Sequence, residues 1–235
     1  QWLHQGTREA PVEFIVPICL VLGLGTRFCA IVLLVMTGAI QWVTGAAAFW
    51  SAVEQAASTL NLFAAQNTRN SIFGWTFPSS WFQSVNALMI IIFAPVFAWI
   101  WISLGKRDPS SPAKFAFGLV SVGLGFVVMV GAAQASANGV LVSPMWLVLT
   151  YLLHTIGELS LSPVGLSSMT KLAPDRVKGM MMGVWFLAAS VGNLIAGGVL
   201  RFYADFTLPQ VFGAVAAFAI IAGLVMFALV LPIKR

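Results

Sequence analysis

Charged residues are scarce in this chain. Asp, Glu, Lys and Arg together make up 8% of its 235 residues, whereas 60% of the residues are hydrophobic. A water-soluble domain of this length needs more charge than that to stay in solution. The composition therefore excludes a soluble domain and indicates a protein whose solvent is the lipid bilayer.

Cysteine and histidine are rare as well. Cys19 and Cys29 stand in apolar sequence without a CxxC or CxxH pattern, which argues against a disulfide framework and a metal knuckle. The net charge of +5 comes from basic residues in short loops between apolar runs, where we expect them to set membrane topology rather than bind nucleic acid. We expect neither a metal nor an organic cofactor.

The chain begins with Gln1 rather than Met, and no basic segment followed by an apolar run and a small-residue cleavage site is present. We therefore interpret it as a fragment of a longer protein. Residues 1–33 are expected to form a linker or juxtamembrane segment, because the apolar stretch Phe14 to Gly25 contains Pro17 and is too short for a full crossing.

Long apolar windows recur through the rest of the chain. A helix needs about 20 apolar residues to cross the hydrocarbon. Such windows predict helices over about residues 34–64, 80–104, 113–134, 145–169, 179–203 and 208–232. Residues 34–235 are therefore expected to form an all-α transmembrane domain, a six-helix bundle.

The basic residues predict which ends of these helices face the cytoplasm, because cytoplasmic loops retain Lys and Arg. With the amino terminus inside, ten basic residues lie on the cytoplasmic side: Arg8, Arg27, Lys106, Arg107, Lys114, Lys171, Arg176, Lys178, Lys234 and Arg235. Arg69 and Arg201 lie outside. Tryptophans near the helix ends are expected to anchor the bundle at the two membrane interfaces.

Two acidic residues, Glu54 and Glu158, fall inside predicted spans. A carboxylate at mid-bilayer is costly and is usually functional, although a neutral Glu hydrogen-bonded between helices is the structural alternative. Each acid lies in a polar stripe at helical spacing. The stripes are Trp50, Glu54, Ser58 and Asn61, and Tyr151, His154, Glu158 and Ser162. Both faces should line a bundle interior or a watery cavity, with His154 serving either as a structural hydrogen-bonding group or as a proton carrier.

Proline and glycine suggest where these helices bend or pack. Pro163 gives no amide hydrogen to Leu159, so a kink is expected beside Glu158. Kinked or broken helices at mid-membrane recur at the binding sites of secondary transporters. In the span 179–203, Gly179 and Gly183 have small-xxx-small spacing, and further glycines follow at Gly192, Gly197 and Gly198. These small residues predict close helix packing.

The run from Gly157 to Ser167 is GELSLSPVGLS, and TKLAP follows it. This pattern resembles the tenth helix of the proton-dependent oligopeptide transporters, the POT or PTR family of the major facilitator superfamily. FWSAVEQ, which contains Trp50 and Glu54, resembles the seventh helix. SWFQSVN, which ends at Asn86, resembles the eighth. GVWFL, which contains Trp185, resembles the eleventh. The resemblance covers about residues 45–232 and implies helices seven to twelve of a major facilitator fold.

The resemblance implies proton-coupled symport of di- and tripeptides by alternating access, in a multi-pass protein of a bacterial inner membrane. Glu158 matches the acid that engages the peptide's ammonium, and Glu54 matches the acid that takes part in proton coupling, with His154 a further candidate. The other implied substrate-binding residues are Ser162, Asn86, Trp50, Trp185 and Tyr151. The expected partners are the peptide, the proton, the lipid bilayer and an amino-terminal six-helix half.

Other functions stay open at this point. A relative within the family could carry nitrate or another small solute. A metal-ion transporter or membrane metalloprotein could use His154 and Glu158 at i, i+4 spacing with Glu54 as a third ligand. An intramembrane hydrolase is disfavoured because no GxSxG nucleophile with a usable base is evident, so we do not expect an enzyme. A purely structural bundle or receptor would tolerate Gln at both acids.

Overall fold

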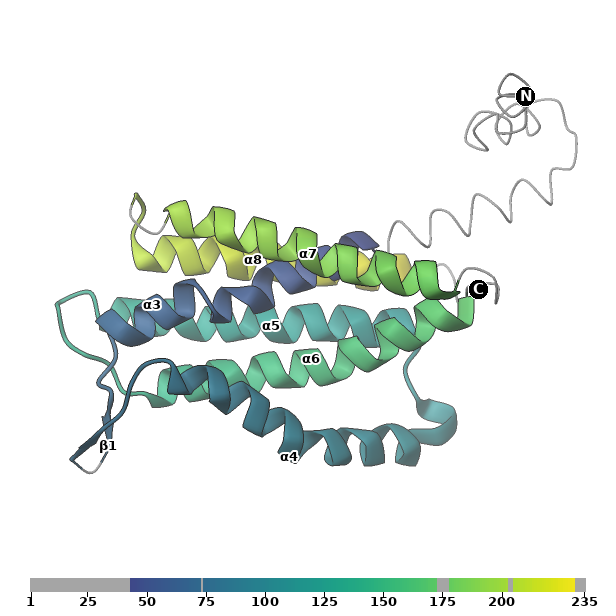
Figure 1. The fold of residues 1–235 in the computed structure, drawn as a ribbon, viewed down its shortest axis with the longest axis horizontal. Helices are drawn as coiled ribbons and strands as arrows, with labels where there is room; N and C mark the ends of the chain where they lie inside the picture. The colour runs from purple at the N-terminus through teal and green to yellow at the C-terminus, as the bar shows by residue number, and fades with distance from the viewer. Residues whose placement is uncertain (1–42, 73, 173–177, 203–204, 231–235) are drawn as a thin grey trace, which may run out of the picture. The chain divides into compact units, whose positions relative to one another are not determined.

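Five long helices dominate the structure. The computed structural model describes residues 43–72, 74–172, 178–202 and 205–230. The long helices are α4 (Trp81–Leu104), α5 (Ser111–Ala135), α6 (Met145–Leu172), α7 (Lys178–Phe202) and α8 (Leu208–Val230). All five are long and apolar enough to cross a membrane, and they run in alternating directions (Figure 1). The all-α transmembrane prediction is confirmed, and the proposed boundary at residue 33 lies outside the described residues.

The first predicted span is not the single helix expected over about residues 34–64. Its described part is a helix over Val43–Val53, a 3-10 turn η2 (Glu54–Ala56) and a short helix α3 (Thr59–Gln66). Ser58 leaves the helical region with φ −113° and ψ −89°. The prediction of a continuous helix is therefore wrong at residues 54–58, and residues 34–42 lie outside the described part of the chain.

A β-hairpin connects α3 to α4. Strands β1 (Ser71–Ile72) and β2 (Trp75–Thr76) pair antiparallel, and Gly74 in the turn has φ +82°, a conformation that side chains with a Cβ disfavour. Trp75 packs against Trp81 with ring centroids 5.1 Å apart, and both rings are about half exposed. The hairpin thus presents exposed indoles at one end of the bundle, as expected for interfacial anchors.

Helix α5 forms the centre of the packing. It contacts α6 along one side and α8 along another. The fully buried side chains of α5 recur at spacings of three and four residues, which places them along one stripe of the helix. They are Phe115, Leu119, Val122, Phe126 and Met129. This stripe makes α5 the core helix of the described bundle.

Glycines allow the helices of this core to approach closely. A Cβ added at Gly157 of α6 would lie 2.7 Å from the carbonyl oxygen of Gly118 on α5, and one added at Gly118 would lie 2.9 Å from that of Gly157. On α7 the expected small-residue contact is not at Gly179 and Gly183, which have nothing within 4 Å among the described residues. Gly192 makes it instead, against the backbone of the Val43–Val53 helix.

Helix α6 stays helical from Met145 to Leu172 and so passes Pro163 without interruption. In Figure 1 it curves in its carboxy-terminal part. The break in helical backbone lies beside Glu54 on another element and not beside Glu158. The kink assigned to Pro163 stays a prediction.

Helix α4 is the least covered of the long helices. Its single buried residue is Phe82, in the first turn. It begins beside α6, and Figure 1 shows its second half, beyond Pro95, running apart from α6. Large apolar side chains along α4, such as Ile91 and Trp99, are more than two-thirds exposed. A face of this kind suits contact with lipid or with further protein.

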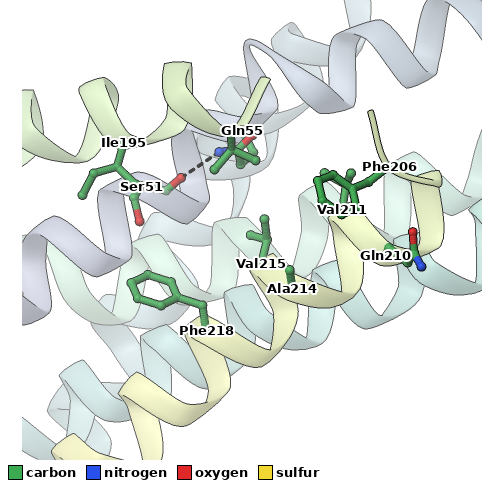
Figure 2. Close-up of a pocket in the computed structure, with 10 residues that line it drawn as sticks. Ser51, Gln55, Ile195, Phe206, Gln210, Val211, Ala214, Val215 and Phe218 are labelled. Carbon is green, nitrogen blue, oxygen red and sulfur yellow. Dashed lines mark hydrogen bonds between the residues drawn. The ribbon is translucent and has the colours of Figure 1, made fainter. Parts of the chain in front are cut away.

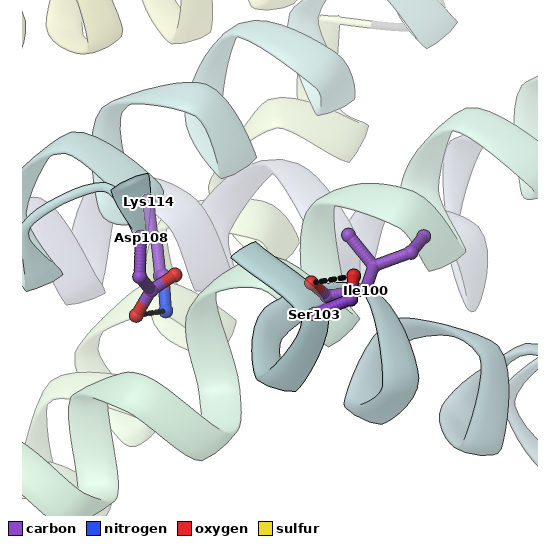
Figure 3. Close-up of polar contacts among 4 residues, drawn as sticks. All are labelled: Ile100, Ser103, Asp108 and Lys114. Carbon is purple, nitrogen blue, oxygen red and sulfur yellow. Dashed lines mark hydrogen bonds and ion pairs between the residues drawn. The ribbon is translucent and has the colours of Figure 1, made fainter. Parts of the chain in front are cut away.

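A cluster of polar residues closes the corner between α4 and α5. The Lys114 ammonium lies 2.7 Å from a carboxylate oxygen of Asp108 (Figure 3). It also lies 4.3 Å from the centre of the Trp101 ring. The same figure shows the Ser103 hydroxyl, which donates to the carbonyl of Ile100 at 2.9 Å in the last turns of α4. The ion pair and the cation–π contact let a nearly buried Lys occupy the first turn of α5.

The two ends of the bundle differ in charge as predicted. Lys106, Arg107 and Lys114 lie at the end where α4 leads into α5. Arg201 ends α7 at the opposite end, where the Arg69 amide donates to the carbonyl of Val142 at 2.9 Å. The remaining basic residues are outside the described ranges or in positions whose side chains are not described.

Candidate functional site

Gln55 stabilises the broken helix that carries Glu54. Its buried amide nitrogen donates to the carbonyl of Ser51 at 3.3 Å and to that of Ala196 on α7 at 3.4 Å. Its amide oxygen accepts from the hydroxyls of Thr59 at 2.9 Å and Ser58 at 3.3 Å. The Gln55 side chain thus bonds the two hydroxyls that follow the 3-10 turn and ties the break to α7.

Glu54 opens this 3-10 turn and is half-buried. Among the described residues, neither Glu54 nor Glu158 forms an ion pair, and the ion pair present is that of Lys114 with Asp108. An acid within a membrane span usually pairs with a basic group or lines a polar cavity. The side chain of Glu54 therefore has capacity for a cation that this part of the chain does not supply.

Glu158 lies where α4 meets α6. The Asn86 amide nitrogen on α4 donates to a carboxylate oxygen of Glu158 at 3.3 Å, and the Thr155 hydroxyl donates to the Asn86 amide oxygen at 2.6 Å. Thr155 is fully buried, whereas Asn86 and Glu158 are half-buried. The three side chains form one hydrogen-bonded chain that ends at an accessible carboxylate.

Asn86 and Glu158, two residues expected in the substrate site, come together from different helices, α4 and α6. Glu54 lies on a separate element, at the start of the 3-10 turn.

Tyr151 and His154 are buried away from this accessible surface. The His154 ring packs against Phe126 of α5 with centroids 5.0 Å apart and against Tyr151 at 6.4 Å. A Cβ added at Gly125 of α5 would meet the same imidazole at 2.7 Å. His154 thus fills the contact between α5 and α6. Ser162, one turn beyond Glu158, is half-buried, and its hydroxyl has no hydrogen-bond partner among the described residues.

The two predicted pocket aromatics contribute mainly to packing in this structure. Trp185 is buried, lies edge-on to Phe115 with centroids 6.5 Å apart, and occupies the space beside Gly165. Trp50 is half-buried, and its ring lies edge-on to Phe49 at 5.6 Å. Trp185 of α7 therefore packs against α5 and against α6, the helix that carries Glu158.

Sequence reasoning passed over Gln55 and Thr155 as site residues. Gln55 follows Glu54 directly, and a buried amide in an apolar span needs hydrogen-bond partners. Thr155 lies three residues before Glu158, a spacing that places both on one helix face. Both signals were present in the sequence, but the stripes through Glu54 and Glu158 did not include these neighbours.

A further cavity of the described bundle lies away from Glu158. It has a volume of about 660 Å³ and lies between the Val43–Val53 helix with its adjoining 3-10 turn, α7 and α8 (Figure 2). Gln55 and Gln210 are its polar lining residues besides Ser51, and the rest are apolar, among them Phe218. The cavity does not include Glu158, and its apolar lining does not suit a charged ligand.

The described residues offer no cluster of three His, Cys, Asp or Glu side chains that could hold a metal ion. The metal site considered from the sequence would need His154 to join Glu54 and Glu158. The imidazole lies instead against Phe126 and Gly125 on α5.

Known proteins resemble this chain along most of its length. The POT family model matches residues 35–217. The peptide transporter YePEPT of Yersinia enterocolitica is 46% identical over 200 residues, which cover 82% of this chain and 39% of that protein. A di-/tripeptide transporter of Lactococcus lactis is 33% identical, with 85% of this chain and 41% of that protein covered. The chain thus spans about two-fifths of the length of these relatives.

Solved structures match the fold as well. Peptide transporter POT in complex with sulfate superposes with a TM-score of 0.79 at 37% identity, covering 94% of this chain and 47% of that chain. A mutant of peptide transporter POT in complex with alafosfalin gives a TM-score of 0.80 at 35% identity, with coverages of 96% and 49%. A POT family transporter in complex with 5-aminolevulinic acid gives 0.78 at 28% identity, with coverages of 100% and 51%.

Proposed function

Because this chain belongs to the POT family, a family of multi-pass integral membrane transporters, we propose that it forms the carboxy-terminal half of a proton-coupled symporter for di- and tripeptides. The observation that carries the proposal is the half-buried carboxylate of Glu158, which accepts a hydrogen bond from Asn86 of a neighbouring helix. In the proposal, an amino-terminal half supplies the other wall of the site, and substrate is exposed alternately to the two sides of the membrane.

Glu158 is proposed to bind the ammonium group of the peptide. Every unblocked peptide carries this group, so recognition through it accepts side chains of any sequence. The relatives that transport peptides support this choice, as does the structure of a relative with 5-aminolevulinic acid, a ligand that has an amino group. Asn86 holds one oxygen of the carboxylate and so limits its rotation, which prepares it for the ligand.

Glu54 is proposed to carry the proton. While ionised, it pairs with a basic residue of the amino-terminal half and ties the two halves together. A proton neutralises it, weakens the tie and lets the halves rearrange. The 3-10 turn that Gln55 holds beside α7 places Glu54 at the break in its helix, where the backbone need not follow a regular helical course.

The driving force available to such a symporter is substantial. Inward movement of one net positive charge gains about 2.3 kcal/mol per 100 mV of membrane potential. Since about 1.4 kcal/mol corresponds to a tenfold ratio, one proton moving with a neutral substrate supports a gradient of roughly fiftyfold at 100 mV.

Replacement of Glu158 tests the substrate assignment. In the full-length protein reconstituted in liposomes, Glu158→Gln should abolish uptake of a labelled dipeptide, because a neutral amide cannot neutralise an ammonium in a site of low polarity. Asp205→Asn is the matched control, since Asp205 is exposed in the connection before α8, and it should transport normally.

Near-normal dipeptide uptake by Glu158→Gln would refute the role of Glu158. A wild-type protein that takes up nitrate but no dipeptide would replace the proposed substrate by an anion, the alternative left open from the sequence. Competition by dipeptides with free and with acetylated amino groups separates these outcomes further, because the proposal requires the free amine to compete.

A further inference from the structure

The Thr155 hydroxyl lies at the start of the hydrogen-bonded chain that ends on Glu158. It donates to the Asn86 amide oxygen at 2.6 Å, the shorter of the two links, and the Asn86 amide nitrogen donates to the Glu158 carboxylate at 3.3 Å. Thr155 is fully buried on α6, and Asn86 reaches it from α4. The buried Thr155 side chain therefore contacts the oxygen of the Asn86 amide, while the nitrogen of the same amide contacts the accessible carboxylate.

The direction of these hydrogen bonds depends on Thr155. An ionised carboxylate accepts hydrogen bonds and donates none, so it needs the nitrogen side of the Asn86 amide to face it. Turned over, the amide would present its oxygen to the carboxylate, and the two would repel each other. A hydroxyl that donates to the amide oxygen favours the first orientation.

We propose that Thr155 is a positioning residue of the substrate site, whose hydroxyl orients the Asn86 amide so that it donates to Glu158 and holds the carboxylate ready for the ligand. The inference rests on the proposed function in that it names a determinant of affinity for the same ligand. Thr155 acts through Asn86 and does not itself contact substrate.

Other hydroxyls of α6 are directed differently. The Thr150 hydroxyl donates to the carbonyl of Trp146 on its own helix at 2.9 Å and to that of Gly125 at 3.3 Å, and the Ser160 hydroxyl donates to the carbonyl of Ile156 at 2.7 Å. The carbonyls of Trp146 and Ile156 are the usual backbone partners of Ser and Thr within a helix, and that of Gly125 is backbone of α5. Thr155 differs in meeting a side chain of a neighbouring helix, and Thr150 provides a control of the same residue type and burial.

Removal of the hydroxyl should weaken ligand binding without stopping turnover. In the full-length protein, Thr155→Val keeps the shape of the side chain but leaves the amide free to turn over. The KM for a dipeptide should rise about two- to tenfold, the effect of one hydrogen bond, while the maximal rate stays near that of the wild type. Thr155→Ser should restore the wild-type KM, and Thr150→Val should leave it unchanged.

A double-mutant cycle tests whether Thr155 acts through Asn86. With Asn86→Ala present, adding Thr155→Val should cause no further rise in KM. An unchanged KM in Thr155→Val, or a full additional rise in the double variant, would overturn the inference even if the wild type transports dipeptides.

A second cycle does not depend on the substrate. The effects of Thr155→Val and Asn86→Ala on thermal unfolding in detergent should be non-additive if the two side chains are coupled. If the wild type takes up no dipeptide, the proposed function fails, and this cycle still decides the contact, since additive effects would overturn it.

Discussion

Gly157 has no room for a side chain. A Cβ built on it lies 2.7 Å from the Gly118 carbonyl oxygen and 2.8 Å from a methyl carbon of Val122, both on α5. Because the first of these neighbours is backbone, the helices must move apart to accept a methyl group. Gly157→Ala should therefore lower the free energy of unfolding by about 1–3 kcal/mol, the usual cost of overpacking. Reversible unfolding in detergent measures the change.

Gly183 provides the matched control for this substitution. It lies within α7 and has nothing within 4 Å of an added Cβ among the described residues. Gly183→Ala should leave stability unchanged or raise it by roughly 0.5–1 kcal/mol, since Ala restricts the unfolded chain more than Gly does. Equal effects of the two substitutions would show that the close contact of α5 with α6 is not what constrains Gly157.

The central acids of the site could be predicted from single residues. The place of Thr155 on the helix face of Glu158 could be predicted as well, whereas its hydrogen bond to Asn86 could not. Glu54 and Glu158 were identifiable because ionisable groups are costly in lipid and demand a reason. Thr155 carries no such signal, since a Thr in a helix normally satisfies its hydroxyl on the preceding turn. In the structure His154 faces α5, whereas the adjacent Thr155 faces α4. This difference depends on where the neighbouring helices lie.

At the scale of elements, we expect the shape of the broken segment Val43–Gln66 to depend on Gln55. Gln55→Leu removes two donors and an acceptor from a buried site and leaves the hydroxyl of Thr59 without this partner. The free energy of unfolding should fall by about 2 kcal/mol, since each neutral hydrogen bond contributes about 1 kcal/mol and these are of mixed quality.

The control for this element is Gln210→Leu. Gln210 also lines the cavity beside α7, but it is exposed and its amide oxygen accepts from the Thr207 amide at 3.1 Å in the first turn of α8. Gln210→Leu should lower the free energy of unfolding by less than about 1 kcal/mol. A Gln55→Leu protein as stable as this control would contradict the role given to Gln55. Hydrogen exchange at residues 54–59 would locate the effect.

The long helices were predictable because the bilayer sets their length and composition. The bounds of α4 to α8 lie within three residues of those predicted from apolar windows. Hydropathy has no corresponding signal for the break at Glu54, because residues 43–66 are apolar on both sides of it. The break depends on the contact between Gln55 and the Ala196 carbonyl, which joins segments 141 residues apart in the sequence.

At the scale of the whole molecule, the distribution of basic residues predicts the topology. The α4–α5 connection should face the cytoplasm and the hairpin end should face outward. With every native cysteine of the full-length protein replaced by Ser, Cys19 and Cys29 among them, a cysteine at Ser80 should react with an impermeant maleimide on intact cells. A cysteine at Arg107 should react only after permeabilisation. Both positions are exposed in the structure.

The reverse labelling pattern would show that the bundle has the opposite orientation in the membrane, with the α4–α5 connection outside. Labelling of both cysteines on intact cells would show that the bundle does not separate them by a membrane. Either result would also remove the basis for assigning the proton a direction of movement through the site.

The division of labour between the two acids makes the last prediction a property of the whole transporter. In the proposal, Glu54 pairs with a basic residue of the amino-terminal half, so the proposed coupling requires both halves. In the full-length protein, Glu54→Gln should still exchange labelled for unlabelled dipeptide, because Glu158 and Asn86 are intact. It should lose accumulation, so the internal concentration approaches the external one, whereas the wild type reaches roughly fiftyfold at 100 mV. Counterflow and voltage-driven uptake in the same liposomes separate the two activities. A Glu54→Gln protein that still concentrates dipeptide would place the coupling proton on another group.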